Sequence, residues 1–282
     1  MIHRSITVAH SPDTDDVFMF WAIATGRLDT GSRRYELLAE DIEVLNRAAR
    51  EGTYDVTAIS FGAYPYLAET YAVLDSGGSI GDDYGPILAA TETMSAADLA
   101  GCCIAHPGKL TTAWLAARLL LENIEGLEVP FKDVGEAIKT GRARAGILIH
   151  EGQLTCERDG LIPIMDLGRA WHAHCQLPLP LGANAIAKSL GSDLMREVAV
   201  DCRASIELAL EHRDEALQWT QERCPGLDIE GAHHYLDMYV NEDTVCMSGA
   251  VREGIARLFK DAHSAGLITE PIHVEIIDGA PS

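Results

Sequence analysis

The sequence is short of positive charge. It contains 22 lysine and arginine residues against 43 aspartate and glutamate residues, which gives a formal net charge of −21 at pH 7. Binding of duplex nucleic acid needs clustered cations that neutralise phosphates, so we expect no nucleic-acid partner. A small anionic ligand stays compatible with this composition, because helix amino ends and a few local cations can hold one inside an acidic protein.

Long apolar runs are also missing. No stretch approaches the roughly 20 residues that a membrane-spanning helix needs, so we expect no membrane association. Residues 1–10 lack the apolar region and the small-residue cleavage site of a secretory signal. Together these two absences predict a cytoplasmic protein.

Paired metal-binding or disulfide cysteines are absent as well. The seven cysteines are odd in number and include no C-x-x-C pair. The histidines of the pairs 172/174 and 233/234 have no third ligand at a recognisable spacing. We therefore expect reduced thiols and neither a disulfide framework nor a zinc site.

What is present is an alternation of short apolar runs and helical patterns. The 282 residues, 47% of them hydrophobic, are enough for two domains. Strands are expected at 6–9, 35–39 and 55–60, with helices after the first two. Because strands and helices alternate, the pattern predicts parallel pairing with helices on both faces of a sheet.

A second α/β set begins at 103–105 and continues through a helix from 111, a helix over 134–139 and a strand over 145–149. Prolines and a glycine make 177–182 a rigid extended passage, and helical periodicity dominates from 193 onward. The layout favours two α/β lobes with a ligand cleft between them. The larger lobe is expected at 1–90 and 186–282, and the inserted smaller lobe at 91–185.

His150 is the first candidate for chemistry. It follows the apolar run Ala-Gly-Ile-Leu-Ile, which has the length and β-branched content of a buried strand. Open α/β sheets bind ligands at the carboxyl ends of their strands, and a histidine there can move protons near neutral pH. The alternative is a histidine that only hydrogen-bonds a loop. Glu151, next in the chain, is a candidate partner acid.

Ser60 ends the expected strand at 55–60, so its hydroxyl should lie at a carboxyl edge too. It is a candidate for binding a substrate carboxylate or hydroxyl, and equally a helix N-cap. A hydrolase triad with His150 is disfavoured, because no G-x-S-x-G motif surrounds this serine.

Thr111 and Thr112 follow a glycine-containing turn and begin a helix. Hydroxyls and free backbone N–H groups at such a point favour a carboxylate cradle. Lys109 adds a cation nearby, although a solvent-facing lysine is the commoner case. The turn lacks the G-x-x-x-x-G-K-[ST] spacing of a nucleotide-phosphate loop.

Asp13, Asp15 and Asp16 follow the first expected strand. Closely spaced carboxylates suit a divalent cation, but they also suit the positive amino end of a helix, with Ser11 as cap and Pro12 at the first helical position. Capping is the favoured interpretation.

Seven segments in order along the chain, between about residue 5 and residue 268, resemble one enzyme family. They are Ser11-Pro-Asp-Thr-Asp-Asp-Val-Phe-Met-Phe20, Glu40-Asp-Ile-Glu-Val-Leu-Asn46, Val56-Thr-Ala-Ile-Ser60, Tyr84-Gly-Pro86, Pro107-Gly-Lys-Leu-Thr-Thr112, Ile149-His-Glu151 and Leu177-Pro-Leu-Pro-Leu-Gly182. Together they are similar to the 1,4-dihydroxy-6-naphthoate synthases of the futalosine route to menaquinone.

This resemblance implies a periplasmic-binding-protein type 2 fold used by a cytoplasmic lyase. The implied reaction converts cyclic dehypoxanthinylfutalosine, a small anionic aromatic and sugar-derived substrate, to 1,4-dihydroxy-6-naphthoate with no organic cofactor or metal. The implied base is His150. The implied substrate-binding positions are Ala58, Ile59, Ser60, Thr111 and Thr112.

Two departures from the family bear on the substrate. Many relatives carry lysine where this chain has Ala58, and many have Ser-Pro-Cys-Pro-Asn-Asp where this chain has Ser-Pro-Asp-Thr-Asp-Asp. Other interpretations are chorismate dehydratase, a related enzyme of the same fold, a non-catalytic carboxylate-binding protein, and a ligand sensor, which the absence of an attached helix-turn-helix disfavours. The long helices expected near the carboxyl terminus are compatible with a homodimer.

Overall fold

The computed structural model describes residues 5–280, and these residues form two compact units. Unit 1 comprises Met1–Ser79, Gly182–Gly249 and His273–Ser282. Unit 2 comprises Ile80–Leu181 and Ala250–Ile272. Each unit has its own sheet and its own core, which confirms the two α/β lobes expected from the sequence.

The sheet of unit 1 runs in the order β12-β4-β11-β3-β1-β2, with β5 paired to β11. Its strands are β1 (Ile6–His10), β2 (Tyr35–Ala39), β3 (Val56–Ser60), β4 (Tyr71–Leu74), β5 (Ser79–Gly81), β11 (Leu179–Ala187) and β12 (Ile276–Ile277). β1 is parallel to both β2 and β3, as the alternating pattern predicts, whereas β11 is antiparallel to β3 and β4. The passage expected at 177–182 therefore feeds directly into a strand.

The helices of unit 1 lie on both faces of this sheet, as the alternating pattern predicts. They are α1 (Thr14–Met19), α2 (Trp21–Ala24), α3 (Ile42–Arg50), α8 (Ser192–Glu211), α9 (Arg213–Gln221), α10 (Ile229–Tyr239) and α11 (Glu242–Val245). Val198 and Cys202 of α8 pack against Val8, Val56 and Ile186 of three neighbouring strands. Burial of such side chains, about 1.5–3 kcal/mol each, holds α8 on the sheet.

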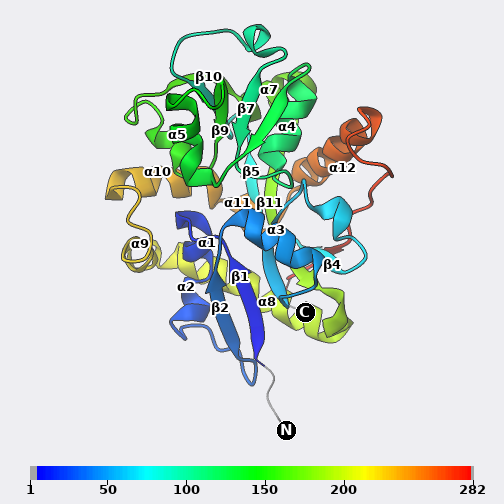
Figure 1. The fold of residues 1–282 in the computed structure, drawn as a ribbon. Helices are drawn as coiled ribbons and strands as arrows, with labels where there is room; N and C mark the ends of the chain where they lie inside the picture. Colours follow the sequence, from blue (N-terminus) through cyan, green and yellow to red (C-terminus); the bar gives the residue numbers. More distant parts are fainter. Residues whose placement is uncertain (1–4, 281–282) are drawn as a thin grey trace. The chain divides into compact units, whose positions relative to one another are not determined.

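Unit 2 has a five-stranded sheet in the order β10-β6-β9-β7-β8. Its elements are β6 (Ile87–Ala90), β7 (Cys103–His106), α4 (Thr112–Leu120), β8 (Glu125–Glu128), α5 (Val134–Lys139), β9 (Ala145–Leu148), α6 (Gly152–Thr155), β10 (Ile162–Asp166) and α7 (Leu167–Cys175). The helix α12 (Gly249–Ser264) begins at the last residue of a unit 1 segment and continues in unit 2. β7 and β9 lie side by side and parallel (Figure 1). Among the helices formed by residues 5–280, none is long and apolar enough to cross a membrane.

The helix α12 departs from the lobe boundaries expected from the sequence. The sequence interpretation assigned everything from 186 onward to the larger lobe, but Ala250–Ile272 belongs to unit 2. A Cβ at Gly254 would lie 2.6 Å from the Pro178 carbonyl oxygen, and Asp261 lies 3.0 Å from His174 Nε2. These contacts join α12 to residues of unit 2 that are distant in sequence.

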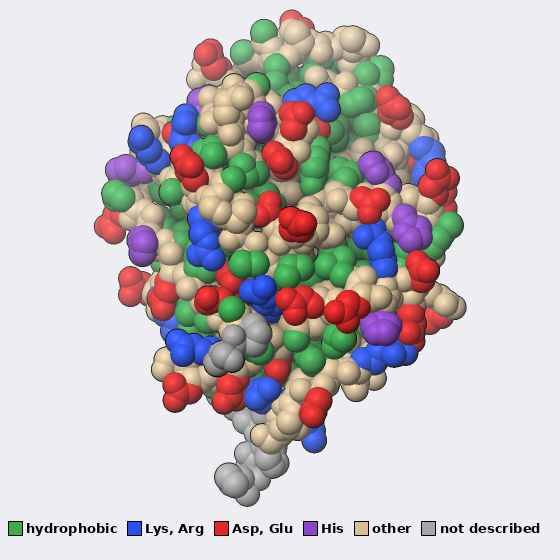
Figure 2. All heavy atoms as spheres, turned by 180° about the vertical axis from the view of Figure 1, so that it is seen from behind, with side chains coloured by type: hydrophobic (Ala, Val, Ile, Leu, Met, Phe, Trp, Pro, Cys, Tyr) green, Lys and Arg blue, Asp and Glu red, His purple; other side chains and the backbone are tan. Residues whose placement is uncertain are grey.

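Acidic and basic side chains are mixed on the face drawn in Figure 2. Red acidic side chains occur from top to bottom of this view with blue basic ones among them, so the acidic residues do not gather in one patch on this face.

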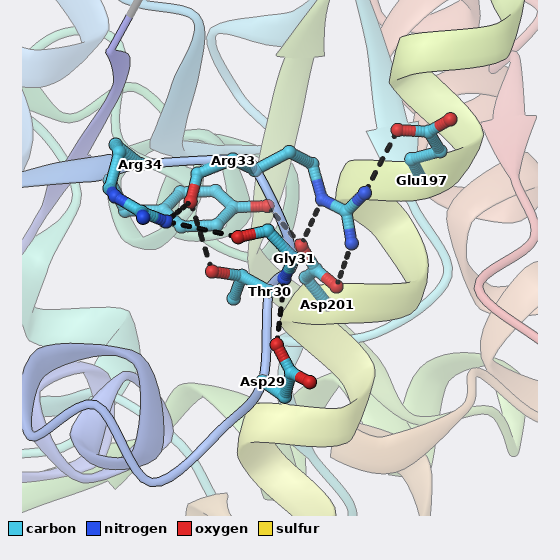
Figure 3. A network of polar contacts seen from close by, with 8 residues as sticks. Asp29, Thr30, Gly31, Arg33, Arg34, Glu197 and Asp201 are labelled. Atoms are coloured by element: carbon cyan, nitrogen blue, oxygen red, sulfur yellow. Dashed lines mark hydrogen bonds and ion pairs between the residues drawn. The ribbon is translucent and has the colours of Figure 1, made fainter. Parts of the chain in front are cut away.

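One buried carboxylate joins β2 to α8 in unit 1 (Figure 3). Asp201, 4% exposed, accepts hydrogen bonds from Arg33 Nε at 2.5 Å and Arg33 Nη2 at 2.9 Å, and from the Tyr35 hydroxyl at 2.6 Å. Glu197 accepts a further bond from Arg33 at 2.9 Å. This paired arrangement satisfies a charge that would otherwise be costly to bury.

Replacing Asp201 with alanine is expected to lower the free energy of unfolding by about 3 kcal/mol, because Arg33 and Tyr35 lose their shared acceptor. Urea unfolding of D201A measures the loss. The matched control is Glu207→Ala on the same helix, whose ion pair with Arg203 is half-exposed and should contribute less than about 1 kcal/mol. Equal losses of unfolding free energy in D201A and Glu207→Ala would contradict a larger stabilising contribution from Asp201.

Two buried histidines are expected to make the stability depend on pH. Burial lowers the pKa of His106, and of His10, below the ordinary 6.5. The unfolded chain therefore binds protons that the folded chain rejects, so stability is full above pH 6.5 and declines as the pH falls toward the folded pKa. In His106→Phe, the slope of unfolding free energy between pH 6.5 and 5 should fall by up to about 1.4 kcal/mol per pH unit. An unchanged slope would contradict this assignment.

Candidate functional site

In unit 1 the candidate residues gather at the carboxyl edge of the sheet. β1 and β3 are parallel and adjacent, so His10 and Ser60, which end these strands, lie at the same edge. β11 runs antiparallel to β3 with Gly182 opposite Ser60. The sequence prediction that Ser60 ends its strand at a carboxyl edge is confirmed.

Asn46 of α3 fixes Ser60 from two sides. Its Oδ1 accepts a hydrogen bond from the Ser60 backbone N–H at 2.8 Å, and its Nδ2 donates to Ser60 Oγ at 3.1 Å. Asn46 is fully buried and Ser60 is 5% exposed. Since Oγ already accepts this bond, its own hydrogen is directed elsewhere, which leaves Ser60 an oriented donor. Sequence reasoning quoted Asn46 in a motif but assigned it no role.

The side chains of Ala58 and Ile59 belong to the core. Ala58 packs in a small apolar cluster with Ala9 and Leu45, and Ile59 is fully buried. The backbone of Ile59 pairs with Ala183 in β11. These two positions therefore offer a ligand only main-chain groups, and Ala58 supplies no charge.

The first loop is buried and acidic. Asp16 accepts a hydrogen bond from the Ser11 N–H at 2.7 Å, and Asp15 accepts one from the Ser79 hydroxyl at 3.0 Å. The expected Ser11 cap is wrong, because α1 begins at Thr14 and Asp13 is its N-cap residue. Asp16 instead ties the loop back onto Ser11. Within residues 5–280, no three His, Cys, Asp or Glu side chains cluster in the manner of a metal site.

In unit 2 the loops that carry the candidate residues also begin at one edge of the sheet. β7 and β9 are parallel, with Ile104 opposite Ala145 and Ala105 opposite Gly146. The loop that leads to Thr111 and the loop that carries His150 therefore leave the same edge. The structure thus brings the strand ends behind these two candidates together, as strand-end placement predicts.

Both threonines are committed to local structure. Thr111 is the N-cap of α4: its Oγ1 accepts from Trp114 N–H at 3.3 Å and donates to the Gly108 carbonyl at 2.8 Å. Thr112 Oγ1 donates to the Leu181 carbonyl at 2.5 Å. Lys109 is exposed, the commoner case. The amino end of the helix, and not the threonine hydroxyls, is what this turn offers an anion.

His150 has an unusual backbone. It follows β9 by two residues with φ at +53°, in the left-handed region that few residues other than glycine adopt. Its partly buried ring lies edge-on to Phe131, with centroids 5.1 Å apart. Glu151 is the N-cap residue of the short helix α6 and makes no side-chain cap bond. The left-handed residue turns the chain just beyond the strand end.

His106 is a polar strand-end residue that sequence reasoning missed. It ends β7, is 1% exposed and stacks on Trp114 at 4.1 Å. A Cβ at Gly126 would lie 2.7 Å from its Nε2, so only glycine fits there. The signal was available, because His106 follows an apolar run just as His150 does. The same signal marks His10, which ends β1 after an apolar run and was missed as well.

Comparison with known proteins agrees with this architecture. Residues 6–264 match the family model described as menaquinone biosynthesis. The chain is 34% identical over 264 residues to 1,4-dihydroxy-6-naphthoate synthase of Thermus thermophilus, which covers 94% of this chain and 96% of that one. A protein of Archaeoglobus fulgidus of known structure is 42% identical, with a TM-score of 0.89, and covers 94% and 98% of the two chains.

The fold extends beyond this family. A Candida albicans protein described as having the generic periplasmic binding protein fold superimposes with a TM-score of 0.73 at 14% identity, covering 95% of this chain and 92% of that one. The expected periplasmic-binding-protein-like fold class is confirmed. The match over residues 6–264 confirms the expected family too: the chain belongs to the menaquinone biosynthesis family.

Proposed function

We propose that this protein is a carbon–carbon lyase that converts cyclic dehypoxanthinylfutalosine to 1,4-dihydroxy-6-naphthoate, with His150 as the general base. Membership of the menaquinone biosynthesis family and 34% identity to a named synthase support the reaction. The observation that supports the base is the left-handed backbone of His150 directly beyond β9. Strained conformations of this kind persist at functional sites when the surrounding structure holds them.

The reaction suits a site that contains one base. Removal of a proton from a substrate hydroxyl lets the electron pair form a carbonyl, which breaks the adjacent carbon–carbon bond. The electrons released from that bond complete an aromatic ring. Because aromatisation drives the step, the protein needs to position the substrate, accept one proton and exclude water.

The remaining candidates have the chemistry of substrate binding. Ser60 Oγ accepts a hydrogen bond from Asn46 Nδ2, and its own hydroxyl hydrogen is the group we assign to the substrate. Thr111 and Thr112 stand at the amino end of α4, whose dipole favours a carboxylate. Ala58 and Ile59 contribute through their main chain. The substrate of this proposal is a small anionic molecule with an aromatic and a sugar-derived part.

The proposal also includes a cytoplasmic location and no nucleic-acid or membrane partner, as the composition favours. We include a homodimer, for which the long helices α8 and α12 offer extended surfaces. Native mass measurement of the purified protein gives the number of copies directly.

Replacing His150 with alanine should lower kcat/KM for the cyclic substrate by about 10²–10⁴-fold, the usual contribution of a positioned base. Formation of 1,4-dihydroxy-6-naphthoate is measured for both proteins. His174→Ala, a histidine of the same unit that pairs with Asp261 at the surface, is the matched control and should stay within twofold of the parent.

Three outcomes of this assay would contradict the proposal. Activity of His150→Ala within tenfold of the parent would remove His150 as the base. Tight binding of the cyclic substrate by the parent protein without product would favour a binding protein. Dehydration of chorismate in place of naphthoate formation would favour the related dehydratase.

The two members of the Asn46–Ser60 pair should differ in their effects on binding and stability. Ser60→Ala should raise KM about tenfold and lower the free energy of unfolding by about 1 kcal/mol, because Asn46 Nδ2 loses its acceptor while Asn46 Oδ1 keeps its bond from the backbone N–H. Asn46→Leu should raise KM and also lower the free energy of unfolding by about 1–3 kcal/mol, because that buried N–H loses its acceptor. A Ser60→Ala variant with an unchanged KM would remove Ser60 from the substrate site.

A further inference from the structure

Three residues stand in register across the carboxyl end of the unit 1 sheet. Ala9 of β1 pairs with Thr57 of β3, which puts His10 beside Ala58. Asn184 of β11 pairs with Ala58 from the other side. Paired residues of neighbouring strands project from the same face of a sheet. Two polar residues therefore flank one small residue on this face.

His10 presents an acceptor at this position. Its Nδ1 lies 2.7 Å from the Ser11 carbonyl oxygen, which can only accept, so the ring proton is on Nδ1. Burial lowers the pKa of His10, although the Ser11 carbonyl and Asp13 partly oppose the shift, so the ring is neutral near pH 7. Nε2 then carries a lone pair, and the hydrogen bond that His10 forms within residues 5–280 uses Nδ1 and not Nε2.

Asn184 presents a second acceptor. It is 1% exposed, and its Nδ2 donates a long bond of 3.5 Å to the Gly77 carbonyl. A Cβ at Gly77 would lie 2.1 Å from Nδ2, so the glycine is what lets the amide pack there. Oδ1 has no hydrogen-bond partner among the described residues. A buried amide oxygen without a partner is costly, and a bound ligand is one way to satisfy it.

The surroundings select the kind of ligand group. Asp15 and Asp16, in the first turn of α1, belong to the same unit, and Asp16 is bonded to Ser11 and Asp15 to Ser79. Their negative charge disfavours a ligand carboxylate, and Ala58 supplies no cation to offset it. Beside these negative charges, neutral hydrogen-bond acceptors favour neutral donor groups on the ligand, and hydroxyl groups are common donors of this kind.

We propose that His10 Nε2 and Asn184 Oδ1 accept hydrogen bonds from hydroxyl groups of the sugar-derived part of the substrate. This inference rests on the proposed function, since it assigns a part of that substrate to unit 1. It makes His10 and Asn184 specificity-determining residues, and it places the substrate carboxylate elsewhere in the protein.

The test compares two ligands that differ in this part. The cyclic substrate carries the sugar-derived hydroxyls, whereas the product 1,4-dihydroxy-6-naphthoate has lost them and keeps the carboxylate. His10→Phe retains a ring beside Phe20, 5.5 Å away, and removes the acceptor. Asn184→Leu retains the branched shape and removes the amide. The dissociation constant of the cyclic substrate should rise about 3–10-fold in each variant, while that of the naphthoate stays within twofold of the parent.

The matched control is His234→Phe, an exposed histidine of α10 in the same unit, for which neither constant should change. Unchanged naphthoate binding also shows that each variant is folded. Should Asn184→Leu fail to fold, Asn184→Ser removes the same oxygen with a smaller change in volume.

Other outcomes would overturn the inference. Unchanged substrate binding in both variants would exclude contact with the hydroxyls, and a parallel loss of naphthoate binding would mean that these residues contact the retained part of the molecule. Failure of the proposed function is seen separately, as a parent protein that binds the cyclic substrate but releases no naphthoate. A parent protein that does not bind the substrate at all would refute both.

Discussion

The arrangement of this protein depends on one constraint: the apolar middle of a buried strand leaves its end as the main place for a polar side chain that can meet a ligand. Val8 and Val56 are fully buried, and polar groups follow within a few residues of each, as His10 and Ser60. The same holds in unit 2, where β7 ends in His106 and β9 is followed by His150. Hydrophobic burial thus forces the chemically useful residues to one edge of each sheet.

Because of this constraint, much of the fold was predictable from the sequence. The helix over 134–139 has the expected bounds, and the strands of the first α/β set pair in parallel as the alternation predicts. What could not be predicted depends on long-range contacts. The return of α12 to unit 2 relies on the fit of Gly254 against Pro178, and no local pattern near residue 254 encodes that contact.

The candidate site was predictable only in part, for the same physical reason. An apolar run followed by a histidine identified His150, and the same rule applied to His10 and His106 would have found them. The rule does not find Asn46, which lies within a helix and acts on Ser60 through a contact 14 residues away in sequence. Nor does it show that the Thr111 and Thr112 hydroxyls are held by backbone carbonyls, since that depends on where Gly108 and Leu181 lie.

The carboxyl edges of the unit 1 and unit 2 sheets differ in charge. This difference accounts for both departures from the family pattern, which are Ala58 and the acidic first loop. In unit 1 the acidic first loop and the uncharged Ala58 leave an edge where Asn184 and a neutral His10 offer acceptors. In unit 2 the amino end of α4 offers partial positive charge. An edge of neutral acceptors is complementary to hydroxyl groups, and an edge of partial positive charge is complementary to a carboxylate. The acidic replacements of the first loop, which look unfavourable for an anionic ligand in the sequence, become favourable once the hydroxyls and not the carboxylate are assigned to unit 1.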